Sequence, residues 1–361
     1  MSVNVPLRKV YAYDLLSAGA IGCRVDAALE SALRSGHLVG GQIRVALDGQ
    51  VIYQRDIGVF DTVNGAPVTA ESIFRLSCLS RLLVSVGAMA LVENGHLSLD
   101  EDIRRWLPDF TPLLADGSQA IITARQLLSH CAGFARRLPA EASSPALTYQ
   151  DASVADDSHL PNTLRQLGQI ALRHRPGSAW GYSMATDVLG AVIAQITGGS
   201  LETALQQHVT GPLRLRNTGY TLADRQRPGP VFVNGKPVYP LRDGMLSTAD
   251  DYLLLLEALR QGGGVLLSKV LIGEMAAIQT GDLDLEGWPG RGFGLGFTVL
   301  RDPVAADSPE SMGTWRLHSA CGHCWFVDPL KRLSAVALTN TAGNTTDSAL
   351  ALLLRNAVYG V

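Results

Sequence analysis

The segment from Ser72 to Gly95 limits the possible folds of this chain more than any other. Its apolar residues recur at the i, i+3, i+4, i+7 spacing of a helix that packs one face on a core, at Leu79, Leu82, Leu83, Val86, Met89 and Ala90. Asn94-Gly95 then ends the pattern, because glycine readily takes the left-handed conformation found at helix C-termini. Cys78 therefore falls in the first turn of the predicted helix, where unpaired backbone N–H groups and the helix dipole favour negative charge.

A chain of 361 residues with 47% apolar and 17% charged residues is expected to be a compact globular protein with a large core. Its net charge of −3, without any run of Lys or Arg, predicts neither a nucleic-acid nor a membrane partner. The N-terminus lacks the pattern of a signal peptide, and no apolar run approaches the ~20 residues that span a bilayer. We therefore expect a cytoplasmic protein.

Strand patterns gather at the two ends of the chain. In residues 41–47 and 50–54, apolar and polar side chains alternate as in half-buried strands. Asp48-Gly49 between these segments is a strong hairpin signal. Near the other end we predict strands at 293–300, 315–321, 324–328 and 333–339. Helices are predicted between the ends, at 123–130, 186–197 and 201–210, with a surface loop at 136–163 and a connection at 223–241.

This order of elements predicts an α+β fold with two regions. Residues 1–74 and 245–361 are expected to form an antiparallel sheet region from both chain ends. Residues 75–244 are expected to form a helical region that carries Cys78 and Tyr182.

Seven short segments, taken in order, resemble one known family. They are Phe74-Arg75-Leu76, Val92-Glu93-Asn94-Gly95, Leu127-Leu128-Ser129-His130, 182–190, 244–252, 293–297 and Trp325-Phe326-Val327-Asp328-Pro329. Over about 41–341 the chain resembles the class C β-lactamase-like esterases and transacylases. This resemblance implies the fold of β-lactamases and penicillin-binding proteins, an antiparallel sheet flanked by helices plus an all-helical region.

The resemblance also implies where a catalytic site would lie. The family pairs a nucleophilic serine with a lysine one helical turn later, as S-x-x-K. Here these positions read Cys78-Leu79-Ser80-Arg81. Tyr182 matches the family's tyrosine, whereas Met184 replaces the asparagine of its Tyr-x-Asn pattern.

The third family motif aligns with Leu317-His318-Ser319, or with His318-Ser319-Ala320 after a shift of one residue. Its basic-Thr-Gly character is lost, and with it the usual contact to a β-lactam carboxylate, so a β-lactamase is not expected. The resemblance therefore assigns catalytic roles to Cys78, Arg81 and Tyr182. His318 lies in the strand that should border Cys78 and is the candidate base or leaving-group acid, with a structural histidine as the alternative. The resemblance assigns substrate binding to four others, Met184, Ser319, Ala320 and His323.

The two changed positions suit each other chemically. Arginine cannot serve as a base, because its guanidinium stays protonated in proteins. A thiol has an ordinary pKa of ~8.5, and an adjacent cation or a helix N-terminus lowers it. Arg81 could therefore hold a Cys78 thiolate without accepting a proton. The alternative is an inert Cys78 and a structural Arg81 at a degenerate site.

Cys321-Gly322-His323-Cys324 has the spacing of a dithiol redox motif, and with His318 it could also form a zinc site. A redox motif needs a helix N-terminus, whereas this segment lies between predicted strands. We expect Cys321 and Cys324 to be small packing residues, and we predict no metal and no cofactor.

These observations predict acyl transfer or hydrolysis through a Cys78 thioester. The expected substrate is a small ester, thioester or amide, free or bound to a carrier protein, as in natural-product biosynthesis. Backbone N–H groups of Cys78 and of Ala320 or Cys321 would form the oxyanion hole. Two alternatives remain: a non-covalent acid/base enzyme of cyclase or isomerase type that uses Tyr182 and His318, and a non-catalytic binding protein.

Overall fold

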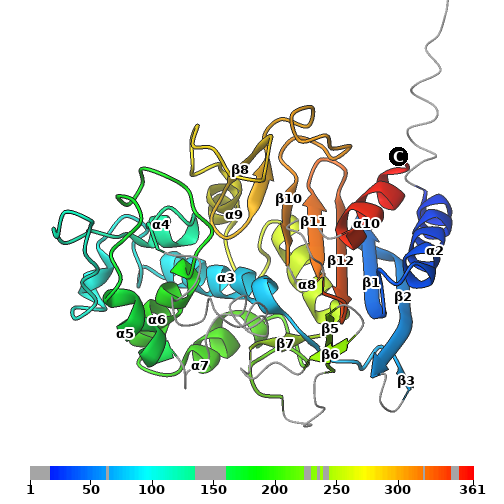
Figure 1. The fold of residues 1–361 in the computed structure, drawn as a ribbon, viewed down its shortest axis with the longest axis horizontal. Helices are drawn as coiled ribbons and strands as arrows, with labels where there is room; N and C mark the ends of the chain where they lie inside the picture. The colour runs from blue at the N-terminus through cyan, green and yellow to red at the C-terminus, as the bar shows by residue number, and fades with distance from the viewer. Residues whose placement is uncertain are drawn as a thin grey trace, which may run out of the picture.

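The computed structural model describes residues 17–61, 65–134, 160–222, 229–233, 236–238, 244–319, 322–342 and 349–361. Figure 1 shows a twisted sheet on one side of the molecule and a group of helices on the other, with α8 (Ala249–Arg260) between them.

The main sheet joins the two ends of the chain. Its strand order is β3-β2-β1-β12-β11-β10-β9-β8, and neighbouring strands run antiparallel. The strands are β1 (Gly40–Leu47), β2 (Gln50–Asp61), β3 (Ala66–Pro67), β8 (Arg291–Phe293), β9 (Thr298–Leu300), β10 (Trp315–His318), β11 (Cys324–Asp328) and β12 (Leu333–Thr339). The junction is the pairing of β1 with β12, where Gly41 lies opposite Thr339 and Leu47 opposite Leu333.

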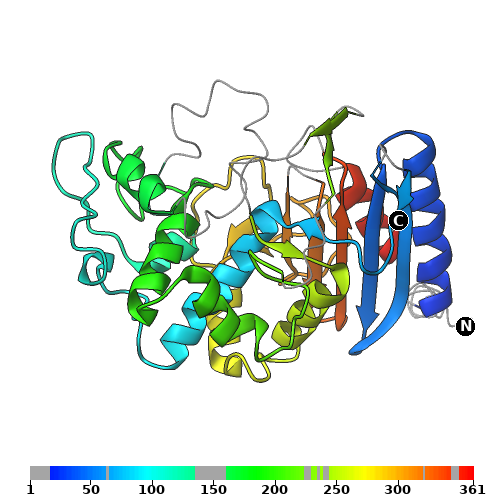
Figure 2. The ribbon, with the colours of Figure 1, turned by 90° about the horizontal axis from the view of Figure 1, so that it is seen from below.

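The alternation of side chains along each strand separates two cores. In β12, Leu333, Ala335 and Ala337 pack with α2 (Ala18–Arg34) and α10 (Ala349–Tyr359) on the outer face. Val336 and Leu338 point to the opposite face, into the larger core shared with the helical region. Figure 2 shows α2 as the outermost layer beyond β1 and β2.

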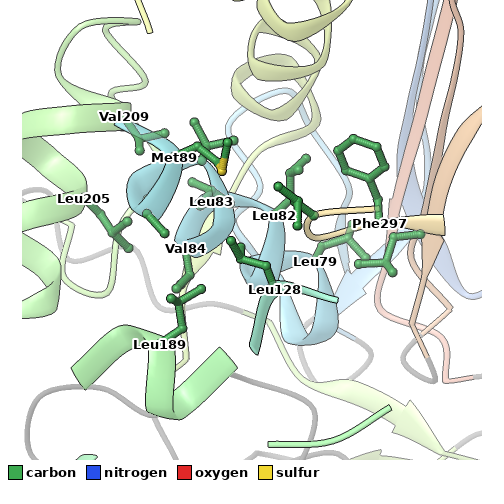
Figure 3. Packing of buried hydrophobic residues seen from close by; sticks show 14 of the residues in the cluster. Leu79, Leu82, Leu83, Val84, Met89, Leu128, Leu189, Leu205, Val209 and Phe297 are labelled. Atoms are coloured by element: carbon green, nitrogen blue, oxygen red, sulfur yellow. The ribbon is translucent and has the colours of Figure 1, made fainter. Parts of the chain in front are cut away.

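The helical region is built around α3 (Ser80–Glu93), which is buried from Ser80 to Leu91. Figure 3 shows its leucine and valine side chains packed against Leu189, Leu205 and Phe297. The other helices are α4 (Ala124–Leu128), α5 (Leu160–Gly168), α6 (Ala185–Thr197), α7 (Leu201–Leu205) with a π-helical turn at Gln206–Thr210, and α9 (Lys269–Ala276). Two short sheets complete the fold: β4 (Phe74–Arg75) with β7 (Leu246–Ser247), and β5 (Val231–Val233) with β6 (Lys236–Val238).

The α+β fold class predicted from the sequence is confirmed, with an antiparallel sheet, flanking helices and a helical region. The division at residues 75 and 245 into two regions stays a prediction. Among the described helices no single one is long and apolar enough to cross a membrane. The helices Ala185–Thr197 and Leu201–Thr210, which are bent relative to each other, are long and apolar enough only when taken together. The first of them is largely buried in the protein.

Two predicted connections are partly wrong. The predicted loop 136–163 overlaps α5, whose first residue is Leu160; residues 135–159 lie outside the described part. The signal for this helix was a proline in its first turn, followed by leucines at 164 and 167. The predicted connection 223–241 contains β5 and β6, and the Asn234-Gly235 pair between them is a typical hairpin sequence.

The predicted strand 293–300 is interrupted by a turn between β8 and β9. Gly296 has a φ of +109°, and a Cβ there would come within 2.5 Å of Ser85 Oγ on α3. Its N–H donates to the carbonyl of Leu128. The chain leaves the sheet here to touch the central helix, which only glycine permits at this distance and φ.

Leu83→Ala tests the packing of α3. Leu83 is fully buried, so its truncation is expected to lower the free energy of unfolding by about 2–5 kcal/mol through lost burial and a residual cavity. Leu254→Ala on α8 is the matched control, because that leucine is 53% exposed and should change stability by less than about 1 kcal/mol. Urea unfolding measures the free energy of unfolding of both variants, and an equal loss of stability in the two would contradict the central position of α3.

Candidate active site

Cys78 lies in the turn just before α3. Ser77–Leu79 forms a 3₁₀ turn, and α3 begins only at Ser80, so Cys78 precedes the α-helix and is not in its first turn as predicted. Ser77 has a φ of 51°, an uncommon conformation for a residue with a side chain. The Ser80 hydroxyl donates to the Ser77 carbonyl at 2.6 Å, and the hydroxyl of Tyr252 donates to the Leu79 carbonyl at 2.9 Å. These bonds fix the turn from both sides.

The thiol of Cys78 is largely enclosed. The residue is 7% exposed. Little of the residue is therefore open to a reacting group.

Arg81 lies one turn further on and is buried, with 3% of its surface exposed. Its Nη1 donates to the carbonyl of Ser183 at 2.9 Å and to the Thr186 hydroxyl at 3.0 Å. The guanidinium carbon lies 4.9 Å from the centre of the Tyr182 ring. Cationic groups in this position over an aromatic ring are attracted by its π-electrons. The side chain thus connects α3 to the segment that begins α6.

The surroundings of Arg81 keep its guanidinium charged. Burial alone would lower the pKa of its guanidinium, but attraction to Tyr182, to Cys78 and, less strongly, to Asp187 raises that pKa above its ordinary value. Arg81 is therefore a permanent cation, and two predicted catalytic residues, Tyr182 and Cys78, are among the groups that raise its pKa.

Tyr182 contacts both Arg81 and His130. The ring centres of Tyr182 and His130 are 4.5 Å apart. The ring centres of His130 and Phe293 are 5.2 Å apart, and these two rings are nearly perpendicular. Burial and the nearby Arg81 charge hold the pKa of His130 well below its usual value, so its ring is neutral. His130 is not among the site residues predicted from the sequence. Its contact with Tyr182 was not visible from a spacing of 52 positions in the chain.

The third motif approaches the turn at Cys78 through Ser319. The Ser319 hydroxyl donates to the Ser77 hydroxyl at 3.1 Å, one residue before the thiol. The backbone of His318 lies in β10 opposite Cys324, but its side chain is outside the described part. Ala320 and Cys321 also lie outside it. The roles predicted for these three residues stay predictions.

His323 contacts the protein backbone through both ring nitrogens. Its Nδ1 accepts from the Thr339 N–H at 3.0 Å, so Nε2 carries the proton and donates to the Arg75 carbonyl at 2.6 Å. This geometry suits a residue that holds the segment before Cys78 better than one that contacts substrate. Met184 is buried in the main core at the start of α6. Substrate binding by Met184 and His323 stays a prediction.

Cys324 is placed as a packing residue. It lies in the core shared with α2 and α10, and burial raises the pKa of its thiol to about 12. The ring nitrogens of His323 are engaged as described above. Within the described ranges, no group of three or more His, Cys, Asp or Glu residues is arranged to hold a metal ion.

Comparison with known proteins supports the architecture. The family model described as Beta-lactamase matches residues 25–359. Esterase EstB of Burkholderia gladioli is 35% identical over 382 residues, which cover 95% of this chain and 96% of that protein.

Solved structures show the same fold. EstCE1, a hydrolase with promiscuous acyltransferase activity, superposes with a TM-score of 0.85 at 35% identity, covering 95% of this chain and 99% of its own. Simvastatin synthase (LovD) from Aspergillus terreus superposes with a TM-score of 0.73 at 21% identity, covering 94% and 98%.

The buried ring of His323 predicts a loss of stability in acid. Burial outweighs the hydrogen bond to Arg75 and lowers the pKa of His323 to about 4, below the ~6.5 of an exposed histidine. The unfolded chain therefore binds a proton that the folded protein does not, between about pH 6.5 and pH 4. The stabilisation is complete above about pH 6.5 and is lost as pH falls through this window, by up to about 1.4 kcal/mol per pH unit.

Urea unfolding between pH 7 and 4 measures this effect. In His323→Gln, the glutamine amide can still donate to the Arg75 carbonyl. The slope of the free energy of unfolding against pH should be smaller in this variant, by the contribution of about one proton. An unchanged slope would show that His323 is protonated equally in both states.

Proposed function

This chain belongs to the beta-lactamase family and is an enzyme of that fold, and we propose that it is an esterase or acyltransferase that forms a thioester at Cys78. Its substrate in this proposal is a small ester, thioester or amide. Arg81 is the fixed cation of the site, and Tyr182 moves the proton.

The burial of Arg81 carries the proposal. A buried charge is costly unless it is paired. Arg81 is held by a carbonyl, a hydroxyl and a ring face, and Tyr182 and Cys78 are among the groups that raise the pKa of its guanidinium. In general, a fixed cation beside a thiol favours the thiolate, which is the form that a thiol nucleophile requires. Lysine in the same position could give up its proton, whereas arginine cannot.

The reaction then proceeds in two balanced steps. The Cys78 thiolate attacks the carbonyl carbon, the carbon–sulfur bond forms, and the bond to the leaving alcohol breaks as Tyr182 gives that oxygen its proton. In the second step the Tyr182 phenolate takes a proton from water or from an acceptor alcohol. The resulting nucleophile attacks the thioester and releases the Cys78 thiolate, with Tyr182 again protonated.

The relatives support both possible acceptors. Esterase EstB and EstCE1 are 35% identical to this chain over nearly its whole length, and EstCE1 combines hydrolysis with acyl transfer. A cytoplasmic location, a biosynthetic substrate and a carrier protein as acyl donor are also proposals, supported by the sequence alone.

Substitution of the two changed motif residues tests the proposal by activity on p-nitrophenyl butyrate. Cys78→Ala should lower kcat/KM by about a thousand-fold or more, because the covalent route is lost. Cys78→Ser should be nearly as damaging, since Arg81 cannot take the hydroxyl proton. Cys78→Ser combined with Arg81→Lys restores the family motif and should recover part of the activity. Cys23→Ala is the control, because Cys23 is exposed and on α2.

Activity that survives Cys78→Ala would contradict the covalent route. It would favour non-covalent proton transfer by Tyr182, which the further variant Tyr182→Phe would then abolish.

Alkylation by iodoacetamide near neutral pH gives a second test. Cys78, Cys131 and Cys324 are similarly buried, so burial alone predicts equal rates. Burial raises the pKa of the thiols of Cys131 and Cys324, which leaves them protonated. In a Cys23→Ala background we expect Cys78 to react at least about tenfold faster than these two thiols, as judged by peptide mapping.

Arg81→Met should remove this difference, because it takes away the cation that favours the thiolate. Equal labelling of the three buried thiols in the wild-type chain would contradict the role given to Arg81.

A further inference from the structure

A cavity of about 380 Å³ lies between the β8 edge of the sheet and α10, and none of the candidate active-site residues lines it. Three arginines from separate elements face it: Arg291 of β8, Arg316 of β10 and Arg355 of α10. Trp288 and Leu352 add apolar wall. The volume is within the range of small-molecule binding sites.

The three arginines are buried, each with 6–8% of its surface exposed. Nη2 of Arg291 donates to Oε2 of Glu310 at 2.5 Å, and Nη1 of Arg316 lies 3.6 Å from the same oxygen. Arg355 donates from Nε and Nη2 to the side-chain carbonyl of Asn356. Nη1 of Arg291 is buried and has no hydrogen-bond partner among the described residues.

Arg291 and Arg316 share the single carboxylate of Glu310, so this buried group of three side chains carries a net positive charge. Among the described lining residues the one carboxylate is that of Asp307, which is exposed. Burial and repulsion from Arg316 lower the pKa of Arg291 to about 10 in spite of its contact with Glu310. An anion in the cavity would pair the excess charge and relieve this repulsion.

We propose that this cavity is a second binding site, for a small organic molecule that carries an oxyanion group, a carboxylate or a phosphate. Arginine forks match both groups through paired N–H donors, and three arginines line this cavity. The apolar wall of Trp288 and Leu352 takes the rest of the ligand. The proposal does not depend on the chemistry at Cys78.

Isothermal titration of the full chain with sodium phosphate and with sodium benzoate tests the site, with sodium chloride at equal ionic strength as the reference. At least one of the two should bind saturably, with a dissociation constant of millimolar or lower, and should raise the melting temperature above that in chloride. Tighter binding of phosphate than of benzoate identifies a phosphate ligand, and tighter binding of benzoate identifies a carboxylate ligand. Binding of neither above the chloride reference would overturn the proposal.

Variants locate the binding. Arg355→Gln should weaken it at least about tenfold, through loss of a charge-assisted contact. Arg301→Gln is the matched control, because Arg301 is exposed and lies outside the cavity lining, and it should bind as the wild type does. Asn356→Asp supplies a carboxylate beside Arg355 and should abolish binding in a folded protein, which keeps the test valid if Arg355→Gln does not fold. Wild-type affinity in Asn356→Asp would overturn the proposed location.

Discussion

The burial of α3 is the constraint on which the rest of this structure depends. Every residue from Ser80 to Leu91 is buried, so the helix cannot shift or rotate without disturbing both the sheet and the surrounding helices. Arg81 is on this helix and must be buried with it. Its position is then fixed by the Ser183 carbonyl, the Thr186 hydroxyl and the Tyr182 ring, which lie where α6 begins. The core packing that stabilises the fold therefore also sets the geometry of the candidate active site.

The change from the serine–lysine pair of the family to Cys78 and Arg81 is consistent with this geometry. A lysine that acts as a base must exist without its proton, whereas the charge on Arg81 is permanent and is stabilised by its neighbours. A thiol benefits from a permanent cation, because it reacts as an anion. His130, neutral and against Tyr182, limits where that ring can move.

Much of the fold could be predicted from the sequence, because its signals are local. The apolar spacing of α3 and the hairpin at Asp48-Gly49 each depend on neighbouring residues. The break between β8 and β9 could not be predicted, since it depends on a contact between Gly296 and Ser85. For the same reason the pairing of His130 with Tyr182 and the two backbone contacts of His323 were missed. In the site, the motif positions of Cys78, Arg81 and Tyr182 could be assigned from the sequence, but the carbonyl and hydroxyl that hold Arg81 could not.

The most direct measurement of the central claim is the intact mass of the enzyme, quenched in acid within milliseconds to seconds of mixing with an activated ester. The account predicts a transient increase by one acyl group, which peptide mapping places on the sulfur of Cys78 and which hydroxylamine removes. Turnover of the ester without any such adduct, or an adduct on another residue such as Ser77 or Ser80, would contradict it.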